Sequence, residues 1–174
     1  VDLETTMSEI IYPLAKETIN EEDIDALCDW LKSYPRLTKG AVTVEVEGKW
    51  AGYIGTKHAV FNNSGSSANL LMIYAALMTG RIKNKKIVVP SVGWVTTIAP
   101  AIQFGLGAAY GDGSMVGTVG DMSSFSFYFG HQLSTIEGGM VNTDDKELYD
   151  ALLMLRSHGW AKDLDQAAYD TLIR

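Results

Sequence analysis

The stretch KHAVFNNSGSSANLLMIYAALMTG, residues 57–80, decides the fold class, because it joins two hydrophobic patterns across a turn of small residues. Residues 58–62 predict a short strand, and residues 67–78 predict a helix that ends at Gly80. A second apolar strand in KKIVVPS (85–91) and a helix in TTIAPAIQFG (96–105) repeat the order. This alternation predicts an α/β fold with a mostly parallel sheet flanked by helices.

The flanking sequence supplies further elements. Residues 20–33, NEEDIDALCDWLKS, predict an amphipathic helix that begins at Asn20, with Cys28 as a small buried hydrophobe within it. Two more strands are predicted in SSFSFYF (123–129) and GGMVNTD (138–144), and a capped helix in DDKELYDALLMLRSHG (144–159). The last residues, DQAAYDTLIR, stop in mid-pattern, so we expect a C-terminus cut inside a larger protein.

Composition bounds the class of protein. A chain of 174 residues with 47% apolar side chains can bury one sizeable core, so we expect one domain. The formal charge of −7 and the absence of a Lys/Arg cluster argue against nucleic acid and anionic membrane surfaces as partners. A single cysteine forms no intrachain disulfide, which favours a reducing compartment. An acidic cytoplasmic enzyme domain fits these observations.

Two segments raise the question of a membrane. The N-terminal residues VDLETTMSEIIYPLAKE carry carboxylates where a secretory signal has a basic region, so we expect no signal peptide. Residues 87–111 carry no charge, which is long enough for a membrane span. Prolines and glycines interrupt that stretch, and a buried strand followed by a buried helix explains it better.

The turn NSGSSAN (63–69) is a candidate phosphate site, because Gly65, Ser66 and Ser67 lie where a strand passes into a helix. Free backbone N–H groups and the positive end of a helix converge at such a point, and the hydroxyls add donors. An ordinary structural Gly/Ser turn is the alternative.

Three further side chains are candidates. Trp94 follows the second strand, at the end where open α/β sheets bind ligands, and its indole can stack on a flat ring or belong to the core. Ser126 lies on a strand five residues before His131 and could face the same pocket or the surface. His131 stands in a polar crossing between two apolar strands, where a satisfied structural histidine is the alternative to a proton-transfer group. No metal site is expected.

Four runs occur together and in order: NNSGSSANL (62–70), VVPSVGWVTTIAPAIQFGL (88–106), GAAYGDGSMVGTVGDMSSFSFYFGH (107–131) and STIEGGMV (134–141), followed by RSHG. Together they resemble the DegT/StrS family of fold-type I pyridoxal-phosphate enzymes, which act on nucleotide-linked keto sugars. The resemblance covers about residues 12–160. It implies a large cofactor-binding domain of that fold, with residues 1–50 as an N-terminal segment and residues 51–160 as the core.

The resemblance gives His131 a specific meaning. In ordinary aminotransferases of the family this position is a lysine that holds the cofactor as a Schiff base, and here no lysine lies between Lys86 and Lys146. Imidazole forms no stable imine but exchanges protons near neutral pH. The change resembles the branch that makes 3-deoxy sugars of the colitose type, the NDP-4-keto-6-deoxyhexose 3-dehydratases.

What that branch implies for this chain is a set of expectations. The cofactor would be pyridoxal 5′-phosphate or pyridoxamine 5′-phosphate, with Gly65, Ser66 and Ser126 on its phosphate, Trp94 on its ring and His131 as the base. The substrate would be a nucleotide-linked 4-keto-6-deoxy sugar, the amino donor a compound such as glutamate, and the protein a cytoplasmic homodimer in deoxysugar and lipopolysaccharide O-antigen synthesis.

One departure from the family pattern lies at residues 106/107, where Leu106 meets Gly107 directly. Family members continue there for several dozen residues, which carry further strands and the aspartate that protonates the pyridine nitrogen. We therefore expect an internal deletion, loss of the C-terminal small domain, and direct pairing of residues 87–89 with residues 125–127 in a sheet of about four strands. A sugar aminotransferase and a non-catalytic remnant that retains the fold are the alternative functions.

Overall fold

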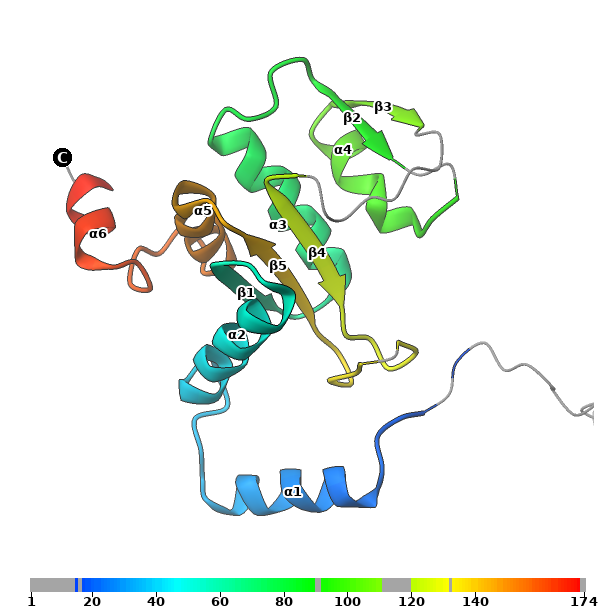
Figure 1. The fold of residues 1–174 in the computed structure, drawn as a ribbon, viewed down its shortest axis with the longest axis vertical. Helices are drawn as coiled ribbons and strands as arrows, with labels where there is room; N and C mark the ends of the chain where they lie inside the picture. The colour runs from blue at the N-terminus through cyan, green and yellow to red at the C-terminus, as the bar shows by residue number, and fades with distance from the viewer. Residues whose placement is uncertain (1–14, 16, 90–91, 111–119, 132, 173–174) are drawn as a thin grey trace, which may run out of the picture.

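A three-stranded sheet lies at the centre of the chain, in the order β1–β5–β4 (Figure 1). The computed structural model describes residues 15, 17–89, 92–110, 120–131 and 133–172. The strands are β1 (His58–Asn62), β2 (Lys86–Val89), β3 (Gly107–Tyr110), β4 (Met122–Ser126) and β5 (Gly139–Thr143). The helices are α1 (Glu21–Lys32), α2 (Ala41–Ile54), α3 (Gly65–Met78), α4 (Ala99–Gln103), α5 (Lys146–Arg156) and α6 (Gln166–Leu172), with a 3-10 turn η1 (Val95–Thr97).

The α/β class is observed, but the expected strand direction is wrong for the central sheet. Both β1 and β4 run antiparallel to β5, with Val60 opposite Val141 and Ser124 opposite Val141. The cause is the connection between β4 and β5, residues 127–138, which contains no helix in its described part and returns the chain antiparallel to β4. Parallel pairing occurs between β2 and β3, which η1 and α4 connect as a crossover.

Direct pairing of residues 87–89 with residues 125–127 is also wrong. The neighbour of β2 is β3, with Val89 opposite Tyr110, and these two strands form a separate sheet. No element was expected at residues 107–110. A strand there gives β2 a parallel partner after a short crossover, so in the described chain β2 and β4 belong to different sheets.

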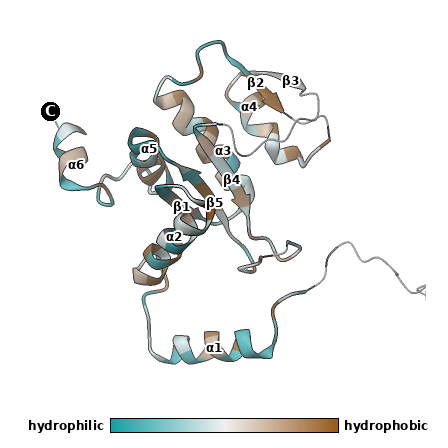
Figure 2. Cartoon of the chain, viewed as in Figure 1, coloured by the Kyte–Doolittle hydropathy of each residue, from teal (hydrophilic) through white to brown (hydrophobic). Residues whose placement is uncertain are grey.

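Helices cover both faces of the central sheet. On one face Val60 and Val141 pack against α3 and α5, in a core completed by Ala68, Ala75, Leu148, Ala151, Leu152 and Leu153. On the other face Ala59 and Met140 pack against Ala51 of α2, together with Trp50. Successive strand residues therefore bury opposite faces, as the period of two requires. Figure 2 shows the apolar residues of β5 at the centre of this arrangement.

The first helix forms where the sequence predicts it. Asn20 caps α1 through a reciprocal pair of hydrogen bonds with Asp23, both 3.0 Å long. The expected burial of Cys28 is wrong, because this side chain is exposed and no residue of α1 is buried. Figure 1 shows the reason, since α1 stands apart from the layers that cover the sheet.

Residues 41–54 carry no predicted element and yet form α2. Their valines alternate with polar residues in a strand-like pattern, at Val42, Val44 and Val46. Tertiary packing outweighs that pattern, because the helix buries Glu47 and Ala51 against the sheet. Among the described helices, none is long and apolar enough to cross a membrane.

Candidate active site

The start of α3 and the end of β4 meet at the predicted phosphate turn. Ser64 caps α3, and its hydroxyl accepts a hydrogen bond of 3.1 Å from the backbone N–H of Ser67. A Cβ atom added to Gly65 would lie 2.4 Å from Cβ of Ser126 and 2.7 Å from its Oγ. Only glycine permits this approach, so the structure brings together two of the five candidate residues at the positive end of a helix.

The other two candidates near this turn are linked through η1. The hydroxyl of Ser66 donates to Oγ1 of Thr96 at 3.2 Å, and Thr96 lies two residues after Trp94. The side chain of Trp94 precedes η1 and is 74% exposed. A core role for this indole therefore does not hold, and its ring is available to stack on a ligand.

A hydrogen-bond chain that the sequence analysis did not identify ties these segments together. Ser124 of β4 donates to Oδ1 of Asn69 at 2.7 Å, and Nδ2 of Asn69 donates to the carbonyl of Thr96 at 3.1 Å. Asn69 thereby fixes η1 to α3 and β4. The available signal was Asn69, a polar residue one turn after Gly65 in a helix that is apolar from Leu70 onward.

His131 lies in the connection from β4 to β5. Its backbone N–H donates to the carbonyl of Tyr128 at 3.0 Å, and its ring stands edge-on to that of Tyr128, 6.2 Å between centroids. The side chain is exposed. Among the described residues no hydrogen bond joins its ring to Gly65, Ser66, Trp94 or Ser126.

These groups suit a phosphorylated aromatic cofactor. The first turn of the 14-residue helix α3, the hydroxyls of Ser66 and Ser126 and the tight approach at Gly65 make up a cradle suited to a phosphate. The exposed Trp94 offers a flat apolar surface beside it. His131 follows Ser126 by five residues in the chain and is exposed.

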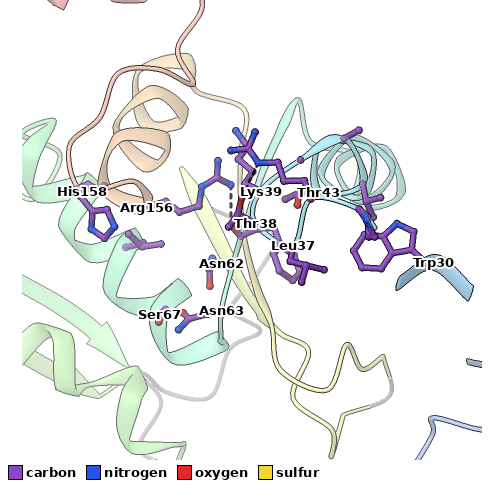
Figure 3. A pocket seen from close by; sticks show the side chains of 18 of the residues that line it. Trp30, Leu37, Thr38, Lys39, Thr43, Asn62, Asn63, Ser67, Arg156 and His158 are labelled. Carbon is purple, nitrogen blue, oxygen red and sulfur yellow. Dashed lines mark hydrogen bonds between the residues drawn. The ribbon is translucent and has the colours of Figure 1, made fainter. Parts of the chain in front are cut away.

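An open groove lies next to this cradle rather than in it. Its volume is about 900 Å³. Figure 3 shows the side chains that line it, among them those from the loop before α2, the end of β1 and the end of α5. Asn63 and Ser67 border it, whereas none of the five candidate residues does. We call it the α2 groove.

Comparison with known proteins identifies the family of this chain. The profile of the DegT/DnrJ/EryC1/StrS aminotransferase family matches residues 17–112 and 105–172. The chain belongs to this family. Its fold is that of the fold-type I enzymes that depend on pyridoxal phosphate.

Within the DegT/DnrJ/EryC1/StrS family the chain resembles dehydratases. It is 30% identical to the GDP-4-keto-6-deoxy-D-mannose 3-dehydratase of Yersinia pseudotuberculosis, over 90% of this chain and 56% of that protein. For the same enzyme of Escherichia coli O55:H7 the values are 29%, 89% and 57%. A UDP-4-amino-4,6-dideoxy-N-acetyl-beta-L-altrosamine transaminase of Campylobacter jejuni is 28% identical over 88% of the chain. The chain therefore spans little more than half the length of these relatives.

Solved structures of the family give the same result. A crystal structure of GDP-4-keto-6-deoxymannose-3-dehydratase with a trapped PLP-glutamate geminal diamine superposes with a TM-score of 0.80 at 28% identity, over 89% of this chain and 57% of that one. An Escherichia coli structure of that enzyme with bound hydrated PLP has a TM-score of 0.78. A Helicobacter pylori aminotransferase at 20% identity, with a TM-score of 0.73, shares the fold.

Proposed function

We propose that this chain represents a pyridoxamine-phosphate-dependent NDP-4-keto-6-deoxyhexose 3-dehydratase. The observation that carries the proposal is His131, an exposed imidazole at the position where the aminotransferases of the family have a lysine. Similarity to two GDP-4-keto-6-deoxy-D-mannose 3-dehydratases supports it. We place the whole protein in the cytoplasm, as a homodimer in deoxysugar and lipopolysaccharide synthesis, with glutamate as the amino donor.

Each candidate residue has a defined task in this proposal. Pyridoxamine phosphate, when bound, supplies an amine and a ring that accepts electrons. Gly65, Ser66 and Ser126 bind its phosphate, and Trp94 stacks on its ring. His131 accepts a proton and returns one to the departing C3 hydroxyl, which an imidazole can do at neutral pH and a Schiff-base lysine cannot do while it is bonded to the cofactor.

A non-catalytic remnant is the second candidate function, and one observation favours it. The alignment to the Yersinia relative spans 223 positions, more than the 174 residues of this chain, and the family profile matches in two segments that meet at residues 105–112. This supports an internal deletion near residues 106/107, with residues 51–160 as one partial cofactor-binding core. The lost block would carry the acidic partner of the pyridine nitrogen, without which the ring accepts electrons poorly.

Cofactor binding and its geometry test the proposal. The purified chain, dialysed after exposure to pyridoxamine phosphate, should retain the cofactor by absorbance and by native mass. The variant His131→Lys, mixed with pyridoxal phosphate and reduced with borohydride, should gain the mass of one covalently bound cofactor on the peptide with residue 131.

The variant His158→Lys is the matched control, because it makes the same change at another exposed histidine. It should gain no adduct at residue 158. A His131→Lys protein that retains cofactor but gives no adduct at residue 131 would contradict the assignment of His131. Retention of cofactor without turnover of a GDP-4-keto-6-deoxy sugar would instead favour the non-catalytic remnant.

A further inference from the structure

One side chain of α3, Asn69, holds two other segments of the chain at the same time. Its Oδ1 accepts from the hydroxyl of Ser124 at 2.7 Å, and its Nδ2 donates to the carbonyl of Thr96 at 3.1 Å. A carbonyl only accepts, so the amide nitrogen must face Thr96 and the amide oxygen must face Ser124. Neither a carboxylate nor an apolar side chain of similar size can make both bonds, so the chemistry of an amide is required here.

The bond to Ser124 belongs to the contact that seats α3 on β4. Asn69 lies one turn after Gly65 on the same face of α3, and Ser124 and Ser126 share one face of β4 because they are two residues apart in a strand. Gly65 approaches Ser126 so closely that an added Cβ would lie 2.4 Å from the Cβ of that serine. Asn69 binds Ser124 one turn further along α3. Its second bond, to Thr96, adds η1 to this pair of elements.

The position of η1 determines where the indole of Trp94 lies. Trp94 directly precedes η1, and its carbonyl accepts from the N–H of Thr97 at 2.9 Å. The indole itself is 74% exposed, so its own packing holds it only weakly. Its placement therefore depends on the backbone of η1, in which Thr96 is the residue hydrogen-bonded to α3.

Thr96 has two hydrogen bonds to α3, and they differ in how they respond to a phosphate. The first joins its Oγ1 to the hydroxyl of Ser66 at 3.2 Å, and the second runs from Nδ2 of Asn69 to its carbonyl. A hydroxyl has one proton to donate, so Ser66 cannot donate to a phosphate oxygen and to Thr96 together. The bond from Asn69 involves no group of the cradle, so phosphate binding does not compete with it.

We propose that Asn69 is a positioning residue of the cofactor site, which holds η1 and thereby Trp94 in place while Ser66 binds the phosphate. The inference rests on the proposed function for the nature of the ligand. Phosphate and ring are then bound by separate groups. The first turn of α3, with Ser66 and Ser126, binds the phosphate, and Trp94, which Asn69 anchors from the next turn of the same helix, contacts the ring.

Two variants separate the two bonds of the amide. Asn69→Asp keeps an acceptor toward Ser124 but turns a carboxylate toward the carbonyl of Thr96, so it should release η1. Ser124→Ala removes the other bond and leaves the amide able to donate to Thr96, so it is the matched control. Without any cofactor, hydrogen exchange in a peptide with residues 94–98 should be about tenfold faster in Asn69→Asp and close to the original rate in Ser124→Ala. Asn69→Leu, which makes neither bond and suits an apolar helix, should behave like Asn69→Asp and replaces it if that variant does not fold.

Tryptophan fluorescence gives a second readout, in the bound state. Pyridoxamine phosphate should quench part of the emission of the original chain, and Trp94→Phe should remove that part. Asn69→Asp should reduce the quenching at saturation and weaken pyridoxamine phosphate binding by about five- to tenfold. Binding of inorganic phosphate, followed by phosphorus NMR, should stay unchanged. A residue that only stabilises the fold would weaken the binding of both ligands alike.

The outcomes separate this inference from the proposed function. Unchanged exchange at residues 94–98 in Asn69→Asp and Asn69→Leu overturns the positioning role, as does undiminished quenching in a variant that binds pyridoxamine phosphate. Equal acceleration in Ser124→Ala also overturns it, because the effect would then come from the packing of α3 on β4. Retention of pyridoxamine phosphate in these cases leaves the proposed function intact. Faster exchange in Asn69→Asp but not in Ser124→Ala, in a chain that does not retain pyridoxamine phosphate, supports Asn69 as the anchor of η1 and counts against the cofactor site.

Discussion

Gly65 lies so close to Ser126 that only a residue without a side chain at position 65 lets α3 and β4 pack at this distance. A methyl group on Gly65 would overlap Cβ, Oγ and Cα of Ser126. We therefore expect Gly65→Ala to separate the start of α3 from β4 and to lower the free energy of unfolding by about 1–3 kcal/mol. Urea denaturation measures this change, and loss of pyridoxamine phosphate binding should accompany it.

Gly52 provides the matched control for that substitution. It lies in α2 with no atom within 4 Å of an added Cβ. Gly52→Ala should raise the free energy of unfolding by about 0.5–1 kcal/mol, because alanine favours the helix. If both substitutions changed the free energy of unfolding equally, the contact with Ser126 would not be the cause of the effect at residue 65.

His58 makes the stability of the fold depend on pH. Burial, and then the nearby charge of Lys146, hold the pKa of His58 below its ordinary value of 6.5, against the opposing effect of Asp150. Its ring stacks on Tyr149 with 4.3 Å between centroids. The unfolded chain therefore binds the proton more strongly, and the free energy of unfolding should fall as pH drops below about 6.5.

The variant His58→Phe isolates this effect, because phenylalanine keeps the stack and does not titrate. Urea denaturation at pH 7, 6 and 5 should show a shallower loss of stability in the variant than in the original chain. Asp145, which accepts from the N–H of Leu148 and pairs with Arg81, has a pKa below its ordinary value of 3.8 and so contributes outside this window. An identical slope in both proteins would rule out His58 as the source.

Single residues also show what the sequence could and could not reveal about the site. The resemblance to the family implied that Gly65 and Ser126 serve one phosphate, and the two residues do lie together. The chain through Asn69, Thr96 and Ser124 did not follow from the sequence, because it joins three elements that lie far apart in sequence. A hydrogen bond of that kind depends on packing that no local pattern specifies.

At the scale of elements, α1 is a helix that local interactions stabilise without help from tertiary packing. Its capping box is complete, and yet none of its residues is buried. Asn20→Ala should destabilise the helix by about 1 kcal/mol and speed hydrogen exchange across residues 21–32. The midpoint of global unfolding should stay unchanged, because little packing depends on α1.

Asp145 is the corresponding control on an anchored helix. It caps α5, accepting from the N–H groups of Glu147 and Leu148, and it also pairs with Arg81 at 2.6 Å. Since α5 buries Leu148 and Leu152, Asp145→Ala should lower the global unfolding midpoint. A fall of the same size with Asn20→Ala would mean that α1 packs on the protein after all.

Element boundaries were more predictable than element partners. Residues 58–62 form the predicted strand without a shift, and the predicted helix at residues 67–78 begins only two residues earlier. The predicted parallel direction of β1 and β4 relative to β5 was wrong. A hydrophobic pattern identifies a strand but does not specify which strand pairs with it. The partner of β2 was missed for the same reason.

Across the whole molecule, one buried ion pair joins the two layers that sandwich the sheet. Glu47 of α2 accepts from Arg156 at the end of α5 and from the backbone N–H of Phe61 in β1. Their side chains are only 9% and 12% exposed. Removal of Arg156 leaves Glu47 buried without its cationic partner, so Arg156→Met should cost about 3–5 kcal/mol of stability. Glu47→Leu should cost less, because Arg156 keeps Asp163 at 3.5 Å.

The double variant tests whether the pair acts as a unit. Its loss of stability should be smaller than the sum of the two single losses, because no uncompensated charge remains. The exposed pair of Glu45 and Lys49 on the same helix is the control, and its removal should leave the unfolding midpoint unchanged. Strictly additive losses at Glu47 and Arg156 would contradict a direct interaction.

The position of β5 between β1 and β4 determines the order in which the chain can fold. β4 and β5 follow each other along the chain and can form a hairpin early, whereas β1 must wait until residues 139–143 have been synthesised. While the ribosome makes those residues, β1 and the apolar side of α3 stay without their partner. We expect nascent chains that end before residue 139 to be protease-sensitive at residues 58–78, and chains that extend beyond α5 to be protected there.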